Sequence, residues 1–449
     1  MNKKHRFRPN ERFLLYSYFL ALVLLGTTLL SMPFSWSGAG GKSQIPVIDA
    51  FFTAVSAACV TGLITVDTSL WSLAGQWIIL ALIQAGGLGI VTFGMLYLVL
   101  PRIRIPLKSG QLLGESFAVE RRISVRGTIK TILGTTLVFE FIGTLLLIVG
   151  FSQAGIDNPV FVGFFHAVSA FCNAGFSVFE GGMLPFRSNL LINLTLMVLI
   201  IAGGIGFVVI RDVRKVFSGR RRQLSFHSRL MLLAVPIFIV VGFIGYMLLD
   251  DTAAFSGFDP PERILATFFQ SVTTRTAGFN TVDQSRLSLA SRWLTLVLMI
   301  IGGGSGSTAG GIKVSTAFIL FIVLLRGVNQ RGDIRLLKRR ISSADVSMAA
   351  MFFLKACVFL LVSILLLGIL EHPRLSGFTT SQIVFECVSA FGTVGLSLGI
   401  TGDLSFAGKL VIAATMFAGR IGLISLVIRP ARNRAEAMIN VPRGEVLIG

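Results

Sequence analysis

Four glycines stand at the same place in four copies of one short sequence pattern. Gly62, Gly175, Gly278 and Gly395 each follow a short, mostly apolar stretch that contains a valine. A glycine adopts φ > 0 without a Cβ penalty, so successive carbonyl groups next to it can point in one direction. Rings of carbonyl oxygens can replace the hydration shell of a monovalent cation. The spacing therefore predicts cation coordination by the main chain.

The candidate coordinating groups are the carbonyls of each glycine and of the two residues before it. These filter residues are Val60, Thr61, Gly62, Asn173, Ala174, Gly175, Thr276, Ala277, Gly278, Thr393, Val394 and Gly395. Each copy supplies one glycine where the TVGYG filter of potassium channels has two, so we expect fewer well-formed binding rings. For any single glycine, close helix packing after duplication is the simpler interpretation. Four glycines at one position favour a pore.

Three copies carry an acidic residue five positions after the glycine. These acids are Asp67, Glu180 and Asp283, whereas the fourth copy has Ile400 there and Asp403 nearby. Carboxylates at an entrance raise the local concentration of cations. The C-termini of the short helices would also face the ion with partial negative charge. We therefore predict an outer vestibule lined by the three acids. The alternative is that they are helix caps or solvated loop acids.

Each short helix also carries one polar residue two positions before its valine. These residues are Thr53, His166, Gln270 and Glu386, and we predict that they support the glycine strands. Two further ionisable residues, Glu140 and Lys355, lie inside long apolar stretches. A charge buried in a membrane is by default paired. The sequence does not identify the partners of these groups.

The sequence shows none of the usual arrangements for enzymatic chemistry. It has no evident triad of nucleophile, base and orienting group, no cluster of metal ligands and no P-loop. The four cysteines have no CxxC spacing and lie in apolar surroundings, where a thiol behaves as a small hydrophobe. A membrane enzyme acting on a lipid-linked substrate would need clustered acids or histidines, and the four histidines are scattered. We therefore predict a conductor, with a sodium or ammonium channel of the same fold as an open alternative.

The elements that position the glycines follow from hydrophobicity. With 53% hydrophobic and 14% charged residues, the chain needs lipid to cover it. Apolar runs long enough to span a bilayer precede each glycine pattern at 13–32, 128–150, 230–249 and 346–370, and others follow at 77–100, 190–210, 294–325 and 406–428. The short helices can only enter and return on the same side. We predict an all-α polytopic membrane protein with four helix–pore-loop–helix repeats, and hence eight transmembrane helices, around one pseudo-fourfold pore. The repeats are expected at 1–100, 101–215, 216–340 and 341–449, with a cytoplasmic tail.

The distribution of basic residues predicts the orientation. The formal net charge is +19, and 29 of the 40 Lys and Arg residues fall in five segments: the N-terminus, 102–130, 211–229, 326–340 and the tail from residue 429. Loops rich in Lys and Arg stay on the cytoplasmic side. Both termini are therefore expected in the cytoplasm, and the basic charge does not indicate nucleic acid. The glycine strands should face outward.

A gate is predicted where the sixth long run is interrupted. Residues 294–325 would form a helix of about 48 Å, longer than the ~30 Å hydrocarbon core. Glycines and hydroxyl residues at mid-membrane remove helix propensity and satisfy freed backbone groups. We expect a loop below the filter, with Arg420 at similar depth in the last helix donating to its carbonyls. The alternative for Arg420 is a packing kink with a snorkelling side chain. The gate residues are Gly302, Gly303, Gly304, Ser305, Gly306, Ser307, Thr308, Gly310, Gly311, Lys313 and Arg420.

Together these motifs resemble the Trk/Ktr/HKT superfamily of potassium transporters, most closely its KtrB branch of membrane subunits. The resemblance covers nearly all of the chain and depends on the four strands, QAGGLGI (84–90), GGGSGSTAGGIK (302–313) and AGRIG (418–422). It implies potassium uptake through a filter lined by the four glycines and a gating loop. It also implies a homodimer in membrane lipid and a cytoplasmic KtrA-type nucleotide-binding ring subunit.

The resemblance also bears on the ligands and on ion selectivity. ATP or ADP would act only through the partner subunit, K⁺ would be cargo rather than a covalent cofactor, and sodium activation is not decided. In plant HKT members a serine in the first strand accompanies sodium preference, whereas this chain has Gly62. GLISL follows Arg420 where proline is common in the family, so the shape of the last helix is not predicted.

Overall fold

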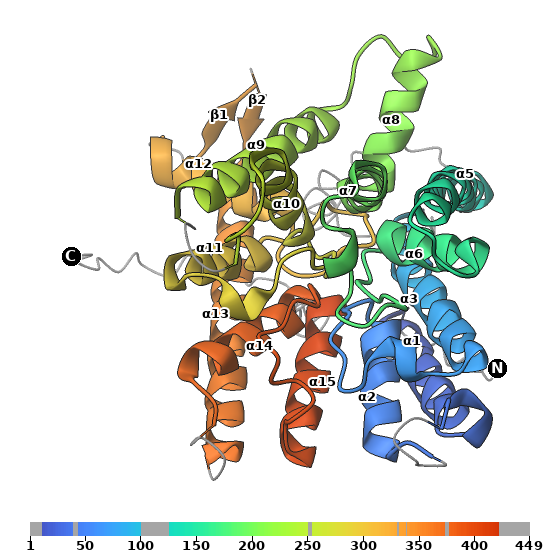
Figure 1. The fold of residues 1–449 in the computed structure, drawn as a ribbon. Helices are drawn as coiled ribbons and strands as arrows, with labels where there is room; N and C mark the ends of the chain where they lie inside the picture. Colours follow the sequence, from blue (N-terminus) through green and yellow to red (C-terminus); the bar gives the residue numbers. More distant parts are fainter. Residues whose placement is uncertain are drawn as a thin grey trace, which may run out of the picture.

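The computed structural model describes residues 11–38, 44–99, 125–249, 254–329, 332–337, 339–372 and 377–421. One order of elements occurs four times: a long helix, a short helix, a nonhelical segment that contains the repeated glycine (called a strand below) and a second helix. The four units lie around a common centre (Figure 1). The two termini and GLISL after Arg420 lie outside the described residues, as do most of the basic residues at 102–130.

Helices of three kinds recur in the four units, in the same order along the chain. The long first helices are α1 (Glu11–Leu30), α5 (Val125–Gln153), α9 (Phe226–Leu249) and α13 (Ser343–Leu370). The short helices are α2 (Val47–Ala58), α6 (Pro159–Cys172), α10 (Pro260–Thr273) and α14 (Thr380–Gly392). The second helices are α3 (Leu73–Val99), α7 (Leu190–Ile205), α11 (Leu289–Ile300) with α12 (Val314–Arg326), and α15 (Phe406–Ile421).

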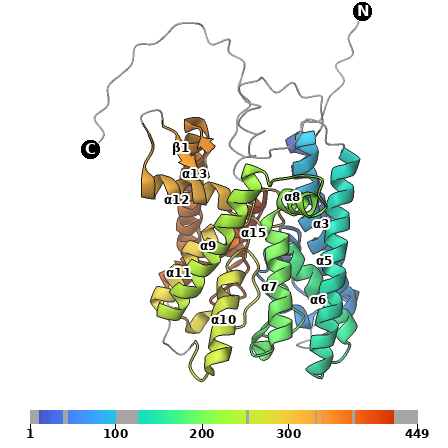
Figure 2. The same ribbon diagram turned by 90° about the horizontal axis from the view of Figure 1, so that it is seen from above.

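Smaller elements connect these helices. They are the 3-10 turns η1 (Pro33–Ser35), η3 (Thr68–Leu70), η4 (Leu184–Phe186) and η5 (Gln284–Arg286), the helix α8 (Phe207–Phe217), and the strands β1 (Ile334–Leu336) and β2 (Arg339–Ile341). The strands pair antiparallel, with Ile334 opposite Ile341. Helix α8 is bent by 99° from α7. In Figure 2, α8 and the β1–β2 hairpin lie toward the same end of the molecule.

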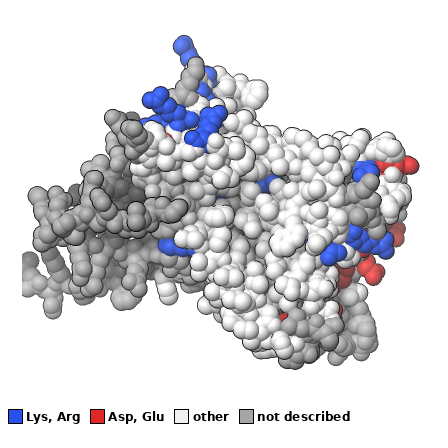
Figure 3. Space-filling model, turned by 90° about the vertical axis from the view of Figure 1, so that its left-hand side faces the viewer, with Lys and Arg blue, Asp and Glu red and all other residues white. Residues whose placement is uncertain are grey.

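The long first helices carry the strongest membrane signal. Among the described residues, four helices are long and apolar enough to cross a membrane, and all four belong to α1, α5, α9 and α13. Of the second helices, α3 counts only as the shorter apolar stretch Leu73–Gly89, and α7 bends into α8. A loop separates α11 from α12, and α15 is described only to Ile421. Large apolar side chains such as Leu137 and Phe141 on α5 are exposed. Figure 3 shows a broad uncharged surface, with the acidic residues in view at one end.

Local sequence explains where the short helices begin. Proline occupies the first position of α6 and α10, where its missing N–H would be unpaired anyway, and Pro46 precedes α2. Helix α14 instead begins with a capping box, in which Thr379 and Gln382 bond each other's backbone N–H. The prolines and the capping box therefore determine the residue at which each short helix begins.

Glycines on the second helices allow the short helices to pack closely against them. A Cβ on Gly86, Gly203 or Gly419 would lie no more than 2.0 Å from a carbonyl oxygen at the C-terminal end of the short helix of the same unit. Between units, α3 contacts α6, α7 contacts α10, α11 contacts α14 and α15 contacts α2. The units therefore close into a ring in the order of the sequence.

Candidate functional site

The four strands share one backbone pattern. In each, a residue with φ between 49° and 65° is followed two positions later by a glycine with φ between 71° and 93°. The first set is Val60, Asn173, Thr276 and Thr393, and the second is Gly62, Gly175, Gly278 and Gly395. The sequence predicted the glycines but not the left-handed conformation of the non-glycine residues. Positive φ at alternate residues turns successive carbonyls toward one side.

The glycines lie against one another around the centre. A Cβ on Gly62 would be 2.4 Å from the carbonyl oxygen of Ala174, and one on Gly175 would be 2.7 Å from that of Ala277. The corresponding distances are 2.4 Å from Gly278 to the Val394 oxygen and 2.3 Å from Gly395 to the Thr61 oxygen. The four strands thus converge, and only glycine fits at these positions.

Hydroxyl groups behind the strands hold them in place. The hydroxyls of Ser56 and Ser389 accept hydrogen bonds from the N–H of Gly62 and Gly395, both at 3.1 Å. Ser169 donates to the carbonyl of Phe176 at 2.8 Å, and Thr273 donates to that of Phe279 at 2.6 Å. Sequence reasoning missed these residues. The available signal was that Ser or Thr directly follows the valine in all four copies.

The polar residues two positions before the valine form a second layer of support. His166 Nε2 lies 3.0 Å from the hydroxyl of Ser177, and Gln270 bonds Gln284 through both amides. Glu386 accepts hydrogen bonds from Ser397 and Thr401. The hydroxyl of Thr53 is buried and has no hydrogen-bond partner. Three of the four residues therefore make hydrogen bonds with side chains that follow the filter glycine of the same unit.

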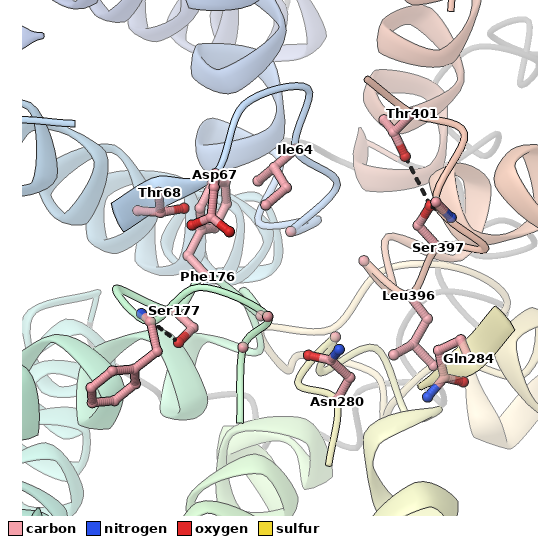
Figure 4. Close-up of a pocket in the computed structure, with 18 of the residues that line it drawn as sticks. Ile64, Asp67, Thr68, Phe176, Ser177, Asn280, Gln284, Leu396, Ser397 and Thr401 are labelled. Carbon is pink, nitrogen blue, oxygen red and sulfur yellow. Dashed lines mark hydrogen bonds between the residues drawn. The ribbon is translucent and has the colours of Figure 1, made fainter. Parts of the chain in front are cut away.

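A pocket of about 240 Å³ lies against the strands and is lined by all four filter glycines. The residues two positions after the glycines also line it: Ile64, Ser177, Asn280 and Ser397 (Figure 4). Asp67 is the one predicted vestibule acid in the lining. Asp67 and Asp283 each accept a hydrogen bond from a backbone N–H at the start of a 3-10 turn, and Asp283 pairs with Arg286 at 3.4 Å. Glu180 is exposed.

The loop between α11 and α12 is fixed by backbone hydrogen bonds. Within the loop and its ends, Gly302 N donates to Ile312 O at 2.8 Å and Val314 N donates to Gly303 O at 3.0 Å. Toward the second unit, Gly304 N donates to Gly204 O at 2.8 Å. The sequence predicted that the helix is interrupted here. It did not predict which residues of the loop and of the second unit bond one another.

The loop lies directly beneath the strands. The hydroxyl of Thr308 donates to Phe171 O at the end of α6 (3.2 Å) and to Gly203 O (3.1 Å). A Cβ on Gly310 would be 2.2 Å from the Thr393 hydroxyl oxygen at the start of the fourth strand. Lys313 Nζ donates to Ala309 O at 2.7 Å, so its ammonium group also faces the loop. The loop therefore contacts the end of α6, helix α7 and the start of the fourth strand.

Arg420 joins the loop to the first unit. Its side chain is buried, with Nη1 donating to the carbonyl of Thr308 in the loop and Nη2 donating to Gly86 O on α3 at 3.2 Å. Its Nε has no hydrogen-bond partner. The guanidinium therefore reaches a loop carbonyl, which is the contact that the sequence predicted, and it also bonds the backbone of the first unit.

Other buried charges have structural partners. Glu140 accepts from Gln84 at 3.1 Å, and Lys409 pairs with Asp49 at 2.7 Å, linking α15 to α2. Lys355 is half-buried. The cysteines are free, and among the described residues no group of three or more His, Cys, Asp and Glu could hold a metal ion. The arrangement is suited to passing a cation between carbonyl oxygens.

The chain is similar to known cation transport proteins. The family model for TrkH, described as a cation transport protein, matches residues 5–439. The chain is 37% identical to the potassium/sodium uptake protein NtpJ of Enterococcus hirae, covering all of this chain and 99% of that one. It is 34% identical to the Ktr system potassium uptake protein B of Vibrio alginolyticus, covering all of this chain and 97% of that one.

A solved structure shares the fold. The crystal structure of the potassium transporter TrkH from Vibrio parahaemolyticus superposes with a TM-score of 0.68. It covers 95% of this chain and 86% of that chain at 22% sequence identity. The predicted all-α, polytopic membrane fold is therefore confirmed.

Proposed function

Because the chain belongs to the TrkH family of cation transport proteins, we propose that it takes up potassium ions across the cytoplasmic membrane of a prokaryote. The chain is a multi-pass membrane cation transporter and not an enzyme.

The convergence of the four strands carries the proposal. Each filter glycine lies against the carbonyl of the next unit, so main-chain oxygens from all four units surround one axis. Carbonyl rings of this kind replace the water around a dehydrated monovalent cation. The pocket lined by the same glycines gives the ion an entrance. NtpJ and the Ktr system protein B are both named for potassium uptake, which supports K⁺ as the cargo.

Sodium is the second candidate cargo. One relative is named a potassium/sodium uptake protein, and none of the four strands has a second glycine within the two positions after the first. A less complete set of rings discriminates less between the two ions. Potassium remains the first candidate because Gly62 occupies the position that is serine in sodium-preferring HKT members.

The loop at 302–313 is the proposed gate. It lies beneath the strands and is tied to Arg420, Gly204 and Phe171. The Thr308 hydroxyl donates to α6 and α7, the Thr308 carbonyl accepts from Arg420 on α15, and Gly304 N donates to Gly204 O on α7. Moving the loop therefore requires breaking contacts with α6, α7 and α15. A signal that shifts these helices would open the path.

We also propose a homodimer and a cytoplasmic nucleotide-binding partner, as the resemblance to Ktr systems implies. Helix α8 carries Arg211, Arg214 and Lys215, and the β1–β2 hairpin carries exposed Arg335 and Arg339 at the same end of the molecule (Figure 2). The positive-inside rule makes this the cytoplasmic end. ATP or ADP would act through the partner at this basic end.

Uptake measured in a bacterial strain that lacks its own potassium transporters tests the proposal. Expression of the chain should restore growth at low external potassium and give rubidium uptake that excess potassium competes away. Sodium uptake without potassium uptake would favour the second candidate. No uptake of either ion, with the protein present in the membrane, would contradict the proposal.

A further inference from the structure

Glu386 is an acid placed directly behind the fourth filter strand. Its side chain lies on α14 and is fully buried, and its two carboxylate oxygens accept hydrogen bonds from different hydroxyls. Ser397 donates to Oε1, and Thr401 donates to Oε2 at 3.0 Å. Both of these hydroxyl residues line the outer pocket (Figure 4). The carboxylate is thus one side chain away from the entrance to the filter.

The contacts of Glu386 also shape that entrance. The Ser397 hydroxyl oxygen lies 3.0 Å from the Thr401 hydroxyl and accepts a hydrogen bond from Gly399 N at 2.9 Å. Gly399 has φ of 93° and lines the pocket as well. The turn from Ser397 to Thr401 therefore closes around the carboxylate. This turn begins two residues after the filter glycine Gly395.

The equivalent residues in the other three units are not acidic. Thr53 is a hydroxyl and Gln270 is an amide. His166 Nδ1 lies 2.8 Å from the carbonyl of Val162, so that nitrogen carries the proton and Nε2 accepts the hydrogen of Ser177. The arrangement at Ser177 thus has the same geometry as at Ser397, with a neutral acceptor. Only the fourth unit offers a carboxylate at this register.

No basic side chain neutralises Glu386 among the described residues. It has no salt bridge there, and Lys409 on the neighbouring α15 is paired with Asp49 at 2.7 Å. Burial disfavours the charged form of a carboxyl group, whereas hydroxyl donors and a nearby cation favour that form without cancelling its charge. Its field therefore extends toward the pocket, where a cation entering the filter is the opposite charge.

We propose that Glu386 is a positioning residue that sets the affinity for the transported cation at the outer mouth. It acts through Ser397 and Thr401, which it orients, and through its charge, which attracts the ion. This inference rests on the proposed function, since it assumes that K⁺ enters through this pocket.

The test compares Glu386→Gln and Glu386→Asp with the wild-type chain in the transport-deficient strain. Glutamine keeps the shape, accepting from Ser397 and donating to Thr401, but removes the charge. We expect the apparent KM for potassium to rise roughly three- to tenfold, because a unit charge is lost near the ion. Vmax per amount of protein in the membrane should stay within about twofold of wild type. Glu386→Asp keeps the charge and should restore much of the affinity.

Asp259→Asn is the matched control. Asp259 is an exposed acid before α10 whose side chain makes no capping hydrogen bond, and its replacement should leave KM unchanged. If Glu386→Gln fails to reach the membrane, Ser397→Ala removes one oriented hydroxyl at the pocket and should also raise KM.

Each result separates the two proposals. A wild-type KM in Glu386→Gln, or a loss of Vmax with KM unchanged, would overturn the role of Glu386 while leaving potassium uptake standing. An unchanged KM in Ser397→Ala would overturn it in the same way. If the wild-type chain itself takes up no potassium, the proposed function fails instead.

Discussion

At the residue scale, the filter depends on backbone conformations that most side chains avoid. Val60, Asn173, Thr276 and Thr393 all have positive φ, and each such residue costs about 1–3 kcal/mol. Hydrogen bonds from the residues behind them offset part of this cost, at about 1 kcal/mol each. Ser169 and Thr273, for example, hold the carbonyls of Phe176 and Phe279. The sequence shows these serines and threonines only as the residue after a valine, so their role could be seen only with the strand in place.

Replacing a filter glycine by serine should abolish selective uptake. Gly62 has φ of 92°, and a Cβ there would lie 2.4 Å from the Ala174 carbonyl oxygen. We expect Gly62→Ser to lower potassium uptake at least about tenfold, because the second strand must move and its carbonyl leaves the ring. Rubidium uptake measures this.

Gly257→Ser is the control for Gly62→Ser. Gly257 has a similar φ of 80°, but a Cβ there meets nothing within 4 Å. The backbone strain is therefore comparable, while the pore is untouched. Equal loss of uptake in the two variants would show that strain, and not the ring of carbonyls, causes the effect.

At the element scale, the break in the sixth long run was predictable and its path was not. Glycines and hydroxyls at 302–313 indicated a loop, and the structure ends α11 at Ile300 and begins α12 at Val314. Where the loop goes depends on contacts between units, such as Thr308 with Phe171 and Gly304 with Gly204. These contacts join residues more than 90 positions apart, and local sequence patterns do not encode them. Likewise, the acids expected at the vestibule include two that bond their own 3-10 turns.

Removing the guanidinium of Arg420 should release the loop. Arg420 is buried and donates to Thr308 in the loop and to Gly86 on α3. We expect Arg420→Gln to increase cation flux several-fold when no partner protein is present, since the loop loses a charge-assisted hydrogen bond. Flux into vesicles that contain only the purified chain measures this.

Arg187→Gln serves as the control for Arg420→Gln, because Arg187 is an exposed arginine in an ion pair with Glu262, and neither residue lines the pocket. Its loss should leave flux unchanged. Unaltered flux in Arg420→Gln, with the protein folded in the vesicles, would contradict a gating role.

A small side chain inside the loop should have a similar effect. A Cβ on Gly304 would lie 2.4 Å from the Ile205 carbonyl oxygen, so Gly304→Ala must displace the loop from the end of α7. We expect higher flux in the same vesicles and unchanged selectivity between potassium and sodium. Gly368→Ala on α13, where a Cβ meets nothing within 4 Å, is the control. Wild-type flux in Gly304→Ala would show that the loop position does not limit conduction.

At the scale of the whole molecule, four units of one chain form the ring that four identical chains form in a tetrameric potassium channel. The units contact one another in sequence order, and α15 returns to α2 through the Lys409–Asp49 pair. The ring was predictable because its pattern recurs in the sequence. The repeat pattern did not predict how the units differ in function. The third unit carries the loop, and the fourth carries Arg420 and Glu386. A single chain can place such residues singly, which a homotetramer cannot.

The central claim is that main-chain oxygens of the four strands bind the transported ion. Anomalous diffraction from crystals of the full chain grown with rubidium or thallium tests it most directly. We predict anomalous peaks on the axis between the strands at 60–62, 173–175, 276–278 and 393–395. Peaks found only elsewhere, or strands separated with no ion between them, would contradict it.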